Sequence, residues 1–121
     1  MAELARLRPG VPVILFPRGV GASYTAFAGL GAAALSLDTT VPMGWAAAGL
    51  GAPELCLQGN LDPVALLGPE AALLAEATRI VAAAAGRPHI FNLGHGVLPP
   101  TPPETVSRLV RHLQSLTEWR T

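Results

Sequence analysis

The chain has 121 residues, with eight arginines, no lysine and eight acidic residues, so its formal net charge at pH 7 is zero. Half of the residues are apolar and only 13% are charged, which excludes a disordered chain. The neutral balance, without a basic run, argues against nucleic acid or an anionic membrane surface as the partner. The length allows at most one domain. The single cysteine, Cys56, cannot form an internal disulfide, which favours a reducing compartment.

Short apolar runs alternate with helical patterns along the chain. Runs that are apolar throughout are typical of strands buried on both faces of a sheet. The expected order is strand 12–16, helix 23–31, strand 34–37, helix 43–50, strand 54–58, helix 69–86, strand 89–92 and a last helix after residue 101. This alternation predicts an α/β fold of four strand–helix units with parallel strands. Four units form either a small open sheet or half of an eight-stranded barrel, because a complete barrel needs about 250 residues.

The last helix carries a start signal and an apolar stripe. Thr101 is the expected N-cap, Pro102 the first helical residue and Glu104 the third, which is the pattern of a capping box. The face expected to be buried consists of Val106, Leu109, Val110 and Leu113.

Residues 19–37 contain no charged side chain and are long enough to span a bilayer. A buried helix followed by a buried strand gives the same hydropathy, and the polar side chains and four glycines of this stretch favour that interpretation. We therefore expect no membrane span. Residues 1–10 lack the apolar segment of a secretory signal, and we expect them to form a helix end or a linker.

Polar side chains follow each predicted strand at its carboxyl end. Functional residues of parallel α/β folds gather at these ends, which meet at one edge of the sheet. The sequence therefore predicts one site at this edge, and its candidate residues are Arg18, Asp38, Gln58, Asn60, Asn92 and His95.

His95 is the most informative of these candidates. It lies between Gly94 and Gly96, whose lack of side chains lets the imidazole approach a ligand closely. There it could bind a carboxylate or move a proton, or it could be a turn histidine that satisfies backbone groups. His89 and His112 are expected to be solvated.

The other charged candidates have structural alternatives. Asp38 is an acid at the mouth of the site, the N-cap of the next helix or a partner for Arg18, and we favour a structural role. Arg18 is either an anion binder or part of a surface salt bridge. Asp62 before Pro63 predicts a turn whose carboxylate caps a helix. No Cys/His cluster has zinc spacing, and no dinucleotide or P-loop fingerprint is present, so the sequence indicates neither a metal nor a standard cofactor.

Two hexapeptides carry a specific resemblance to a known family. Residues 58–63 read QGNLDP and residues 91–96 read FNLGHG. The strands at 12–16, followed by Arg18 and Gly19, and at 35–38 also fall where that family has related segments. From about residue 11 onward, the chain resembles the uroporphyrinogen decarboxylases. Thr39 is a departure, because the family usually has tryptophan there.

The resemblance implies a single partial domain over residues 1–121 that corresponds to the carboxyl-terminal half of a TIM (β/α)8 barrel. It implies a cytoplasmic homodimer that uses no cofactor and no metal. The implied reaction removes the four acetate carboxyl groups of uroporphyrinogen III and gives coproporphyrinogen III, in haem and chlorophyll biosynthesis. The histidine of the NLGHG motif, here His95, is implied to bind substrate, whereas the main catalytic residues are expected in the amino-terminal part.

An isolated half barrel exposes the edges of its outer strands. The expected partner is therefore a second copy of the chain or the missing amino-terminal part of the barrel. The alternative to a decarboxylase is a non-catalytic half-barrel module that oligomerises or binds porphyrinogen without turnover.

Overall fold

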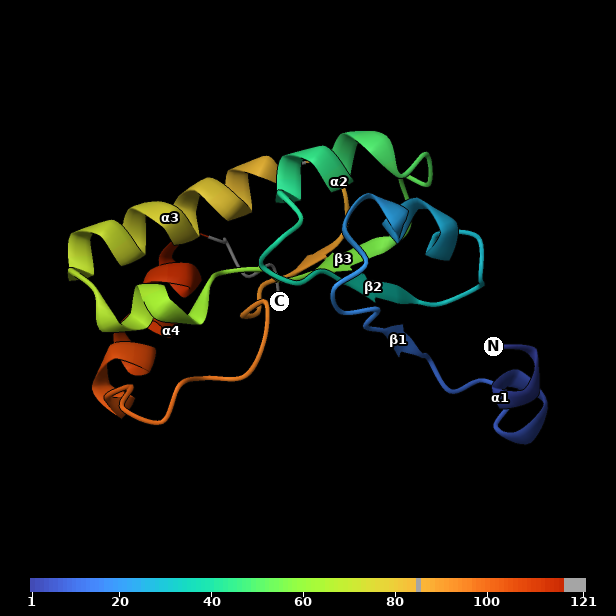
Figure 1. Cartoon of the computed structure of the whole chain (residues 1–121), viewed down its shortest axis with the longest axis horizontal. Coiled ribbons are helices and arrows are strands. Elements are labelled where there is room, and N and C mark those ends of the chain that lie inside the picture. The colour runs from blue at the N-terminus through green and yellow to red at the C-terminus, as the bar shows by residue number, and fades with distance from the viewer. Residues whose placement is uncertain (85, 117–121) are drawn as a thin grey trace.

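Four parallel strands pair in their order along the chain, and the computed structural model describes them within residues 1–84 and 86–116 (Figure 1). They are β1 (Ile14–Leu15), β2 (Ala34–Ser36), β3 (Cys56–Gln58) and β4 (His89–Ile90). β1 pairs with β2, β2 with β3 and β3 with β4, all in parallel. The predicted α/β fold class with four parallel strands is thus confirmed.

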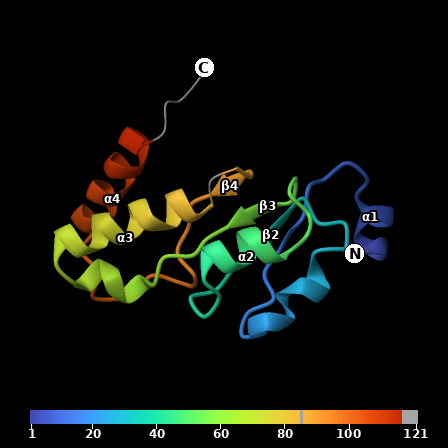
Figure 2. The same ribbon diagram turned by 90° about the horizontal axis from the view of Figure 1, so that it is seen from above.

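The helices are α1 (Ala2–Leu7), the 3-10 helix η1 (Gly21–Phe27), α2 (Met43–Gly49), the 3-10 helix η2 (Pro63–Leu67), α3 (Glu70–Ala83) and α4 (Pro103–Leu116). Figures 1 and 2 show η1, α2 and α3 on one side of the sheet, and α1 beyond β1. The predicted helix at 23–31 is shorter and is a 3-10 helix, because a segment between the positive-φ glycines Gly21 and Gly31 is too short to propagate an α-helix. No helix among residues 1–84 and 86–116 is long and apolar enough to cross a membrane.

The core lies between the sheet and the helices on that side. Paired residues of parallel strands point to the same face, so Leu15, Leu35, Leu57 and His89 share one face. Leu35 and Leu57 are fully buried there and join a cluster that includes Leu73 of α3. Burial of each such leucine contributes about 2 kcal/mol.

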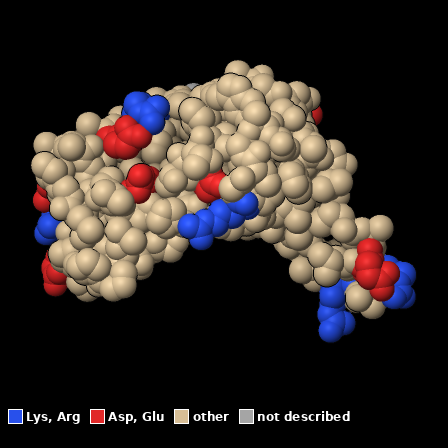
Figure 3. Space-filling model, in the orientation of Figure 1, with Lys and Arg blue, Asp and Glu red and all other residues tan. Residues whose placement is uncertain are grey.

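The opposite face of the sheet carries the alternate residues of each strand. At its two edges, Ile14 is 47% exposed and Ile90 is 44% exposed. Cys56 and Gln58 on β3 are partly exposed. Figure 3 shows the molecule hollowed along its lower side, beneath the sheet. We call this surface the open face.

The predicted buried stripe of α4 is wrong for Val106 and Val110, which are 38% and 45% exposed. Leu109 is buried as expected, and Thr105 is buried beside it. The helix α4 packs on α3, and this contact buries the side that carries Thr105 and Leu109. Arg108 Nε lies 2.8 Å from Glu70 Oε2, at the start of α3.

The predicted capping box is also wrong. The helix begins at Pro103, two residues after Thr101. The Thr101 hydroxyl is buried and has no hydrogen-bond partner. In contrast, Asp62 caps η2 as expected, because its Oδ1 accepts a hydrogen bond from the Val64 amide at 2.9 Å.

Replacing Thr101 with valine distinguishes these two descriptions of the helix start. Because the hydroxyl is buried without a partner, we expect Thr101→Val to leave the free energy of unfolding unchanged or to raise it by up to about 1 kcal/mol. An N-cap would instead lose about 1 kcal/mol. Urea unfolding at one fixed protein concentration measures the difference. Thr105→Val is the control, because the Thr105 hydroxyl accepts a hydrogen bond from Arg108 at 3.3 Å and its loss should destabilise the chain.

Candidate functional site

Asp38 is the centre of the hydrogen bonds at the carboxyl ends of the strands. It follows β2 and is 3% exposed. Its Oδ2 accepts from the Gly19 amide at 2.5 Å, and its Oδ1 accepts from the amide and the hydroxyl of Thr40 at 2.9 and 2.5 Å. Its own amide donates to the buried Tyr24 hydroxyl at 3.1 Å, a contact that no local sequence pattern indicates. The carboxylate therefore ties the loop after β1 to the loop after β2.

The same contacts keep Asp38 ionised. Burial raises the pKa of Asp38, but the hydrogen bonds from Thr40 and Gly19 and the positive charge of Arg18 outweigh it, so the pKa lies below its ordinary value. A buried carboxylate whose oxygens already accept three hydrogen bonds has no proton to give. These contacts are those of a structural residue.

Asn60 ties the loop after β3 to the loop after β2. Its side chain is 8% exposed, and its Nδ2 donates to the Asp38 carbonyl at 2.8 Å and to the Val41 carbonyl. Both hydrogens of the amide are therefore used within the protein. The preceding Gly59 has φ 126°, and a Cβ there would lie 2.8 Å from the Leu37 carbonyl oxygen. The two loops are in close backbone contact at this point.

The loop that carries His95 is held against the other loops by Gly94. Its amide donates to the Leu61 carbonyl at 2.8 Å. A Cβ on Gly94 would lie 2.6 Å from both the backbone nitrogen and Cγ2 of Thr39. Gly96 differs, because nothing lies within 4 Å of its Cβ position. Of the two glycines beside His95, only Gly94 is required for packing.

His95 and Asn92 each keep a free nitrogen. His95 Nδ1 lies 3.2 Å from the Gly96 carbonyl oxygen. Because a carbonyl only accepts, Nδ1 is the donor, and Nε2 is left for a ligand. Asn92 Oδ1 accepts from the Leu93 amide at 2.8 Å, which leaves its Nδ2 donor groups free. Within the described part of the chain, neither His95 Nε2 nor Asn92 Nδ2 has a hydrogen-bond partner.

Arg18 and Gln58 lie at the ends of β1 and β3. Arg18 is exposed, and its charge acts on Asp38. In residues 1–84 and 86–116 it has no acidic oxygen within ion-pair distance. Gln58 lies on the open face, where its Nε2 donates to the Ser36 hydroxyl at 3.0 Å.

The six predicted residues therefore lie at the carboxyl ends of β1 to β4 but form two groups. One group uses its side chains to bind neighbouring protein atoms, namely Asp38, Asn60 and Gln58. The other group keeps unpaired side-chain nitrogens, namely those of Arg18, Asn92 and His95. A cationic guanidinium, an amide and an imidazole suit an acidic ligand.

The expectation that His89 is solvated is wrong. Its side chain is partly buried, with Nε2 2.8 Å from the Gly59 carbonyl oxygen. Its ring meets the Phe91 ring edge-on at 6.2 Å between centroids. The strand register explains this position, because His89 pairs with Leu57 and so points to the helix-covered face.

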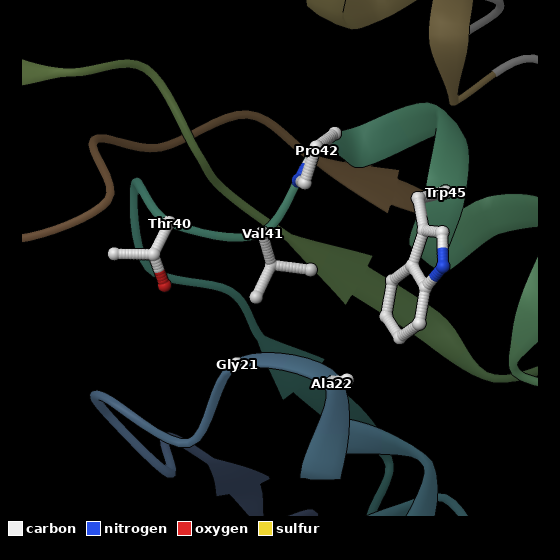
Figure 4. A pocket seen from close by; sticks show the side chains of 6 residues that line it. All are labelled: Gly21, Ala22, Thr40, Val41, Pro42 and Trp45. Carbon is white, nitrogen blue, oxygen red and sulfur yellow. The ribbon is translucent and has the colours of Figure 1, made fainter.

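A separate cavity lies between the start of η1 and the loop that leads into α2. It has a volume of about 230 Å³ and is lined by Gly21, Ala22, Thr40, Val41, Pro42 and Trp45 (Figure 4). None of the six predicted site residues lines it. Within residues 1–84 and 86–116, no three His, Cys, Asp or Glu side chains lie close enough together to hold a metal ion.

Comparisons with known proteins agree on one family. The family model described as uroporphyrinogen decarboxylase (URO-D) matches residues 1–116. The uroporphyrinogen decarboxylase of Gluconacetobacter diazotrophicus is 50% identical over 117 residues, which are 94% of this chain and 32% of that protein. Those of Sphingopyxis alaskensis and Paracoccus denitrificans are 48% and 44% identical, over 93% and 94% of this chain and 33% of each relative. The chain thus spans about a third of the length of the curated relatives it matches.

Alanine at Gly94 and at Gly96 should have different effects on stability. At Gly94 the new Cβ overlaps the backbone nitrogen and Cγ2 of Thr39, so we expect a loss of about 2 kcal/mol. Alanine at Gly96 enters open space and should change the free energy of unfolding by less than about 0.5 kcal/mol. Urea unfolding of both variants measures the contrast, and equal losses would contradict the described packing of the loop.

Asp38→Asn should destabilise the chain in a pH-dependent way. An amide cannot accept the hydrogen bonds of the carboxylate at both oxygens, so a loss of about 1–3 kcal/mol is expected at pH 7. Because the folded pKa of Asp38 is lowered, its contribution is complete above the unfolded value of about 3.9. It is lost as the pH falls through the folded pKa. Urea unfolding at pH 7 and at decreasing pH should show the gap between the two proteins narrowing below about pH 4; a constant gap would refute the assignment.

Proposed function

The chain belongs to the uroporphyrinogen decarboxylase family, and we propose that it supplies the carboxyl-terminal part of a uroporphyrinogen-binding site. The reaction proposed for the complete site is cofactor-free decarboxylation of the four acetate side chains of uroporphyrinogen III to give coproporphyrinogen III. Family membership supports a place in tetrapyrrole biosynthesis and in the cytoplasm. The observation that carries the proposal is the set of unpaired side-chain nitrogens on the loops after β1 and β4, those of Arg18, Asn92 and His95.

The chemistry of the substrate explains why such donors are needed. Each pyrrole ring carries an acetate, so the ligand is strongly acidic. Arg18 can pair with a carboxylate, and His95 Nε2 can donate to one when the imidazole is protonated. Asn92 Nδ2 adds a neutral donor on the loop after β4, which also carries His95. These three residues are proposed to hold and orient carboxylates, and His95 is the one that matches the NLGHG motif.

Decarboxylation of a pyrrole acetate begins with protonation of the ring. Protonation of a pyrrole carbon lets the electron pair of the breaking C–C bond flow into the ring as carbon dioxide leaves. A proton then adds to the former acetate carbon to give a methyl group, and the ring proton is lost. We propose that the groups that move these protons lie in the two thirds of the relatives that this chain does not match, since Asp38 is buried and fully hydrogen-bonded.

The loops beneath the donors have a supporting role in this proposal. Asp38 and Asn60 join the loops after β1, β2 and β3, and Gly94 seats the fourth loop on Thr39. Donors on loops held in this way are positioned before the ligand arrives, so less ordering entropy is lost on binding. Replacing Asp38, Asn60 or Gly94 should therefore weaken binding, because the groups that contact the ligand would be displaced.

A second candidate function is binding without turnover. It is favoured by the contacts of Asp38, because this buried carboxylate at the edge is engaged in hydrogen bonds to neighbouring loops. Turnover separates the two functions, whereas binding of the tetrapyrrole is common to both.

A chimera tests the decarboxylase proposal directly. Residues 1–116 of this chain replace the matching third of the Gluconacetobacter diazotrophicus enzyme, and coproporphyrinogen formation from uroporphyrinogen III is measured without oxygen. We expect the chimera to turn over substrate, and His95→Ala to raise its KM by about tenfold or more because a carboxylate contact is lost.

The matched control is His112→Ala in the same chimera. His112 lies on α4, where its Nε2 is 2.8 Å from the Thr78 hydroxyl of α3. The His112→Ala variant should leave the KM of the chimera unchanged. A folded chimera without activity would leave binding without turnover as the function, and equal effects of the two histidine variants would remove His95 from the site.

A further inference from the structure

The cavity between η1 and α2 is built from two neighbouring strand–helix units of the chain. Gly21 and Ala22 of η1 form one wall, the loop after β2 forms a second, and Trp45 of α2 forms a third (Figure 4). The loop is held in place, because Val41 is 2% exposed and its carbonyl accepts a hydrogen bond from the Asn60 side chain. The cavity is therefore formed by packed parts of the protein before any ligand arrives.

The walls of the cavity are mainly apolar. Figure 4 shows the Trp45 ring and the Val41 side chain directed into the space beside Ala22. Trp45 is 42% exposed, so a large flat apolar surface borders the cavity. Gly21 contributes no side chain, and nothing lies within 4 Å of the position that its Cβ would take. Aromatic rings pack against an indole with a gain beyond the area that they bury, so a flat aromatic ligand suits these walls.

Thr40 supplies the only hydroxyl among the six lining residues. This hydroxyl donates its proton to Asp38 Oδ1 at 2.5 Å, so its oxygen can only accept a hydrogen bond from a ligand. Figure 4 shows the oxygen on the side of Thr40 that faces Gly21. The ionised Asp38 carboxylate behind the hydroxyl disfavours an anion at this position. The wall therefore favours a neutral ligand with an O–H or N–H donor.

The size of the cavity excludes the tetrapyrrole. An engineered apolar cavity of about 150 Å³ in another protein binds benzene. The volume of about 230 Å³ can therefore hold one aromatic ring with a substituent, whereas uroporphyrinogen has four pyrrole rings. The residues proposed to bind that acidic substrate, Arg18, Asn92 and His95, do not line the cavity. Its occupant is thus a different and smaller molecule.

We propose that the cavity binds a neutral single-ring aromatic molecule, with the ring against Trp45 and an O–H or N–H group donating to Thr40 Oγ1. Small phenols and pyrroles have this chemistry. The ligand extends the hydrogen bonds of Asp38 by one step, because Thr40 is bonded to that carboxylate. The inference goes beyond the proposed function and does not rest on it, because it uses only the walls of the cavity and the Thr40 hydroxyl.

Phenol is the probe, and toluene is its match in size without a hydrogen-bond donor. Nitrogen-15 NMR follows the backbone amides and the Trp45 indole of the complete chain while either compound is added. We expect saturable shifts at Ala22 and Trp45, with half-saturation by phenol at about 1 mM or below.

Replacing Thr40 with valine tests the hydrogen bond to the ligand. Valine has nearly the same shape but accepts no hydrogen bond, so the ratio of the toluene and phenol dissociation constants should fall by about fivefold. Thr40→Ser is the conservative control, because it keeps the hydroxyl and should keep this ratio. Circular dichroism checks that both variants fold.

Filling the cavity is a second test that leaves Thr40 and Asp38 unchanged. Ala22→Leu places a larger side chain in the cavity and should weaken phenol binding by about tenfold or more. The matched control is Ala26→Leu, which adds the same side chain at an exposed position of η1 outside the cavity. This control should leave phenol binding unchanged.

Phenol should also bind the chimera with the Gluconacetobacter diazotrophicus enzyme, where ligand-observed NMR measures it. The proposal is overturned if phenol does not bind the chain, if it binds the chain but not the chimera, or if the two leucine variants weaken binding equally. An unchanged ratio of dissociation constants in Thr40→Val would also overturn it, because the ligand would then make no bond to the hydroxyl. None of these outcomes depends on whether the chimera decarboxylates uroporphyrinogen III.

Discussion

The hydrogen bonds around Asp38 hold together the loops at the carboxyl ends of the strands. Its buried carboxylate binds the loop after β1, and its carbonyl is bound by Asn60 from the loop after β3. The loop after β4 joins the same assembly through Gly94, which rests on Thr39. Burial of an ionised group is tolerated here because hydrogen bonds replace its hydration. The positions of Arg18, Asn92 and His95 all depend on this arrangement.

Much of the fold could be predicted from the sequence, because apolar runs and glycines are local signals. The order of strands and helices, the parallel sheet and the cap at Asp62 follow from such signals. The side of α4 that is buried does not follow from such signals. An apolar stripe shows which side of a helix avoids water, but Val106 and Val110 can be buried only if a neighbour is present to cover them. Likewise, Thr101 fits a capping box in sequence, whereas the helix begins two residues later.

The candidate site was predictable as a place but not as a set of roles. Parallel strands bring their carboxyl ends together, which gathers the six residues at one edge. Whether a side chain points to solvent or to a neighbouring loop depends on contacts between distant segments. Asn60 reaches a carbonyl 22 residues away, and Gly94 differs from Gly96 only through Thr39, which no local pattern shows. The two groups of residues could therefore be separated only in the structure.

We propose that the edge held by Asp38 presents His95 to an acidic tetrapyrrole. The most direct measurement is nitrogen-15 NMR of the three histidine side chains of the chain during titration with uroporphyrin III, the stable oxidised form of the proposed substrate. We expect a saturable shift at His95 Nε2, with His89 and His112 nearly unchanged, because those two rings are bonded to Gly59 and Thr78. No response at His95, or an equal response of all three rings, would contradict it.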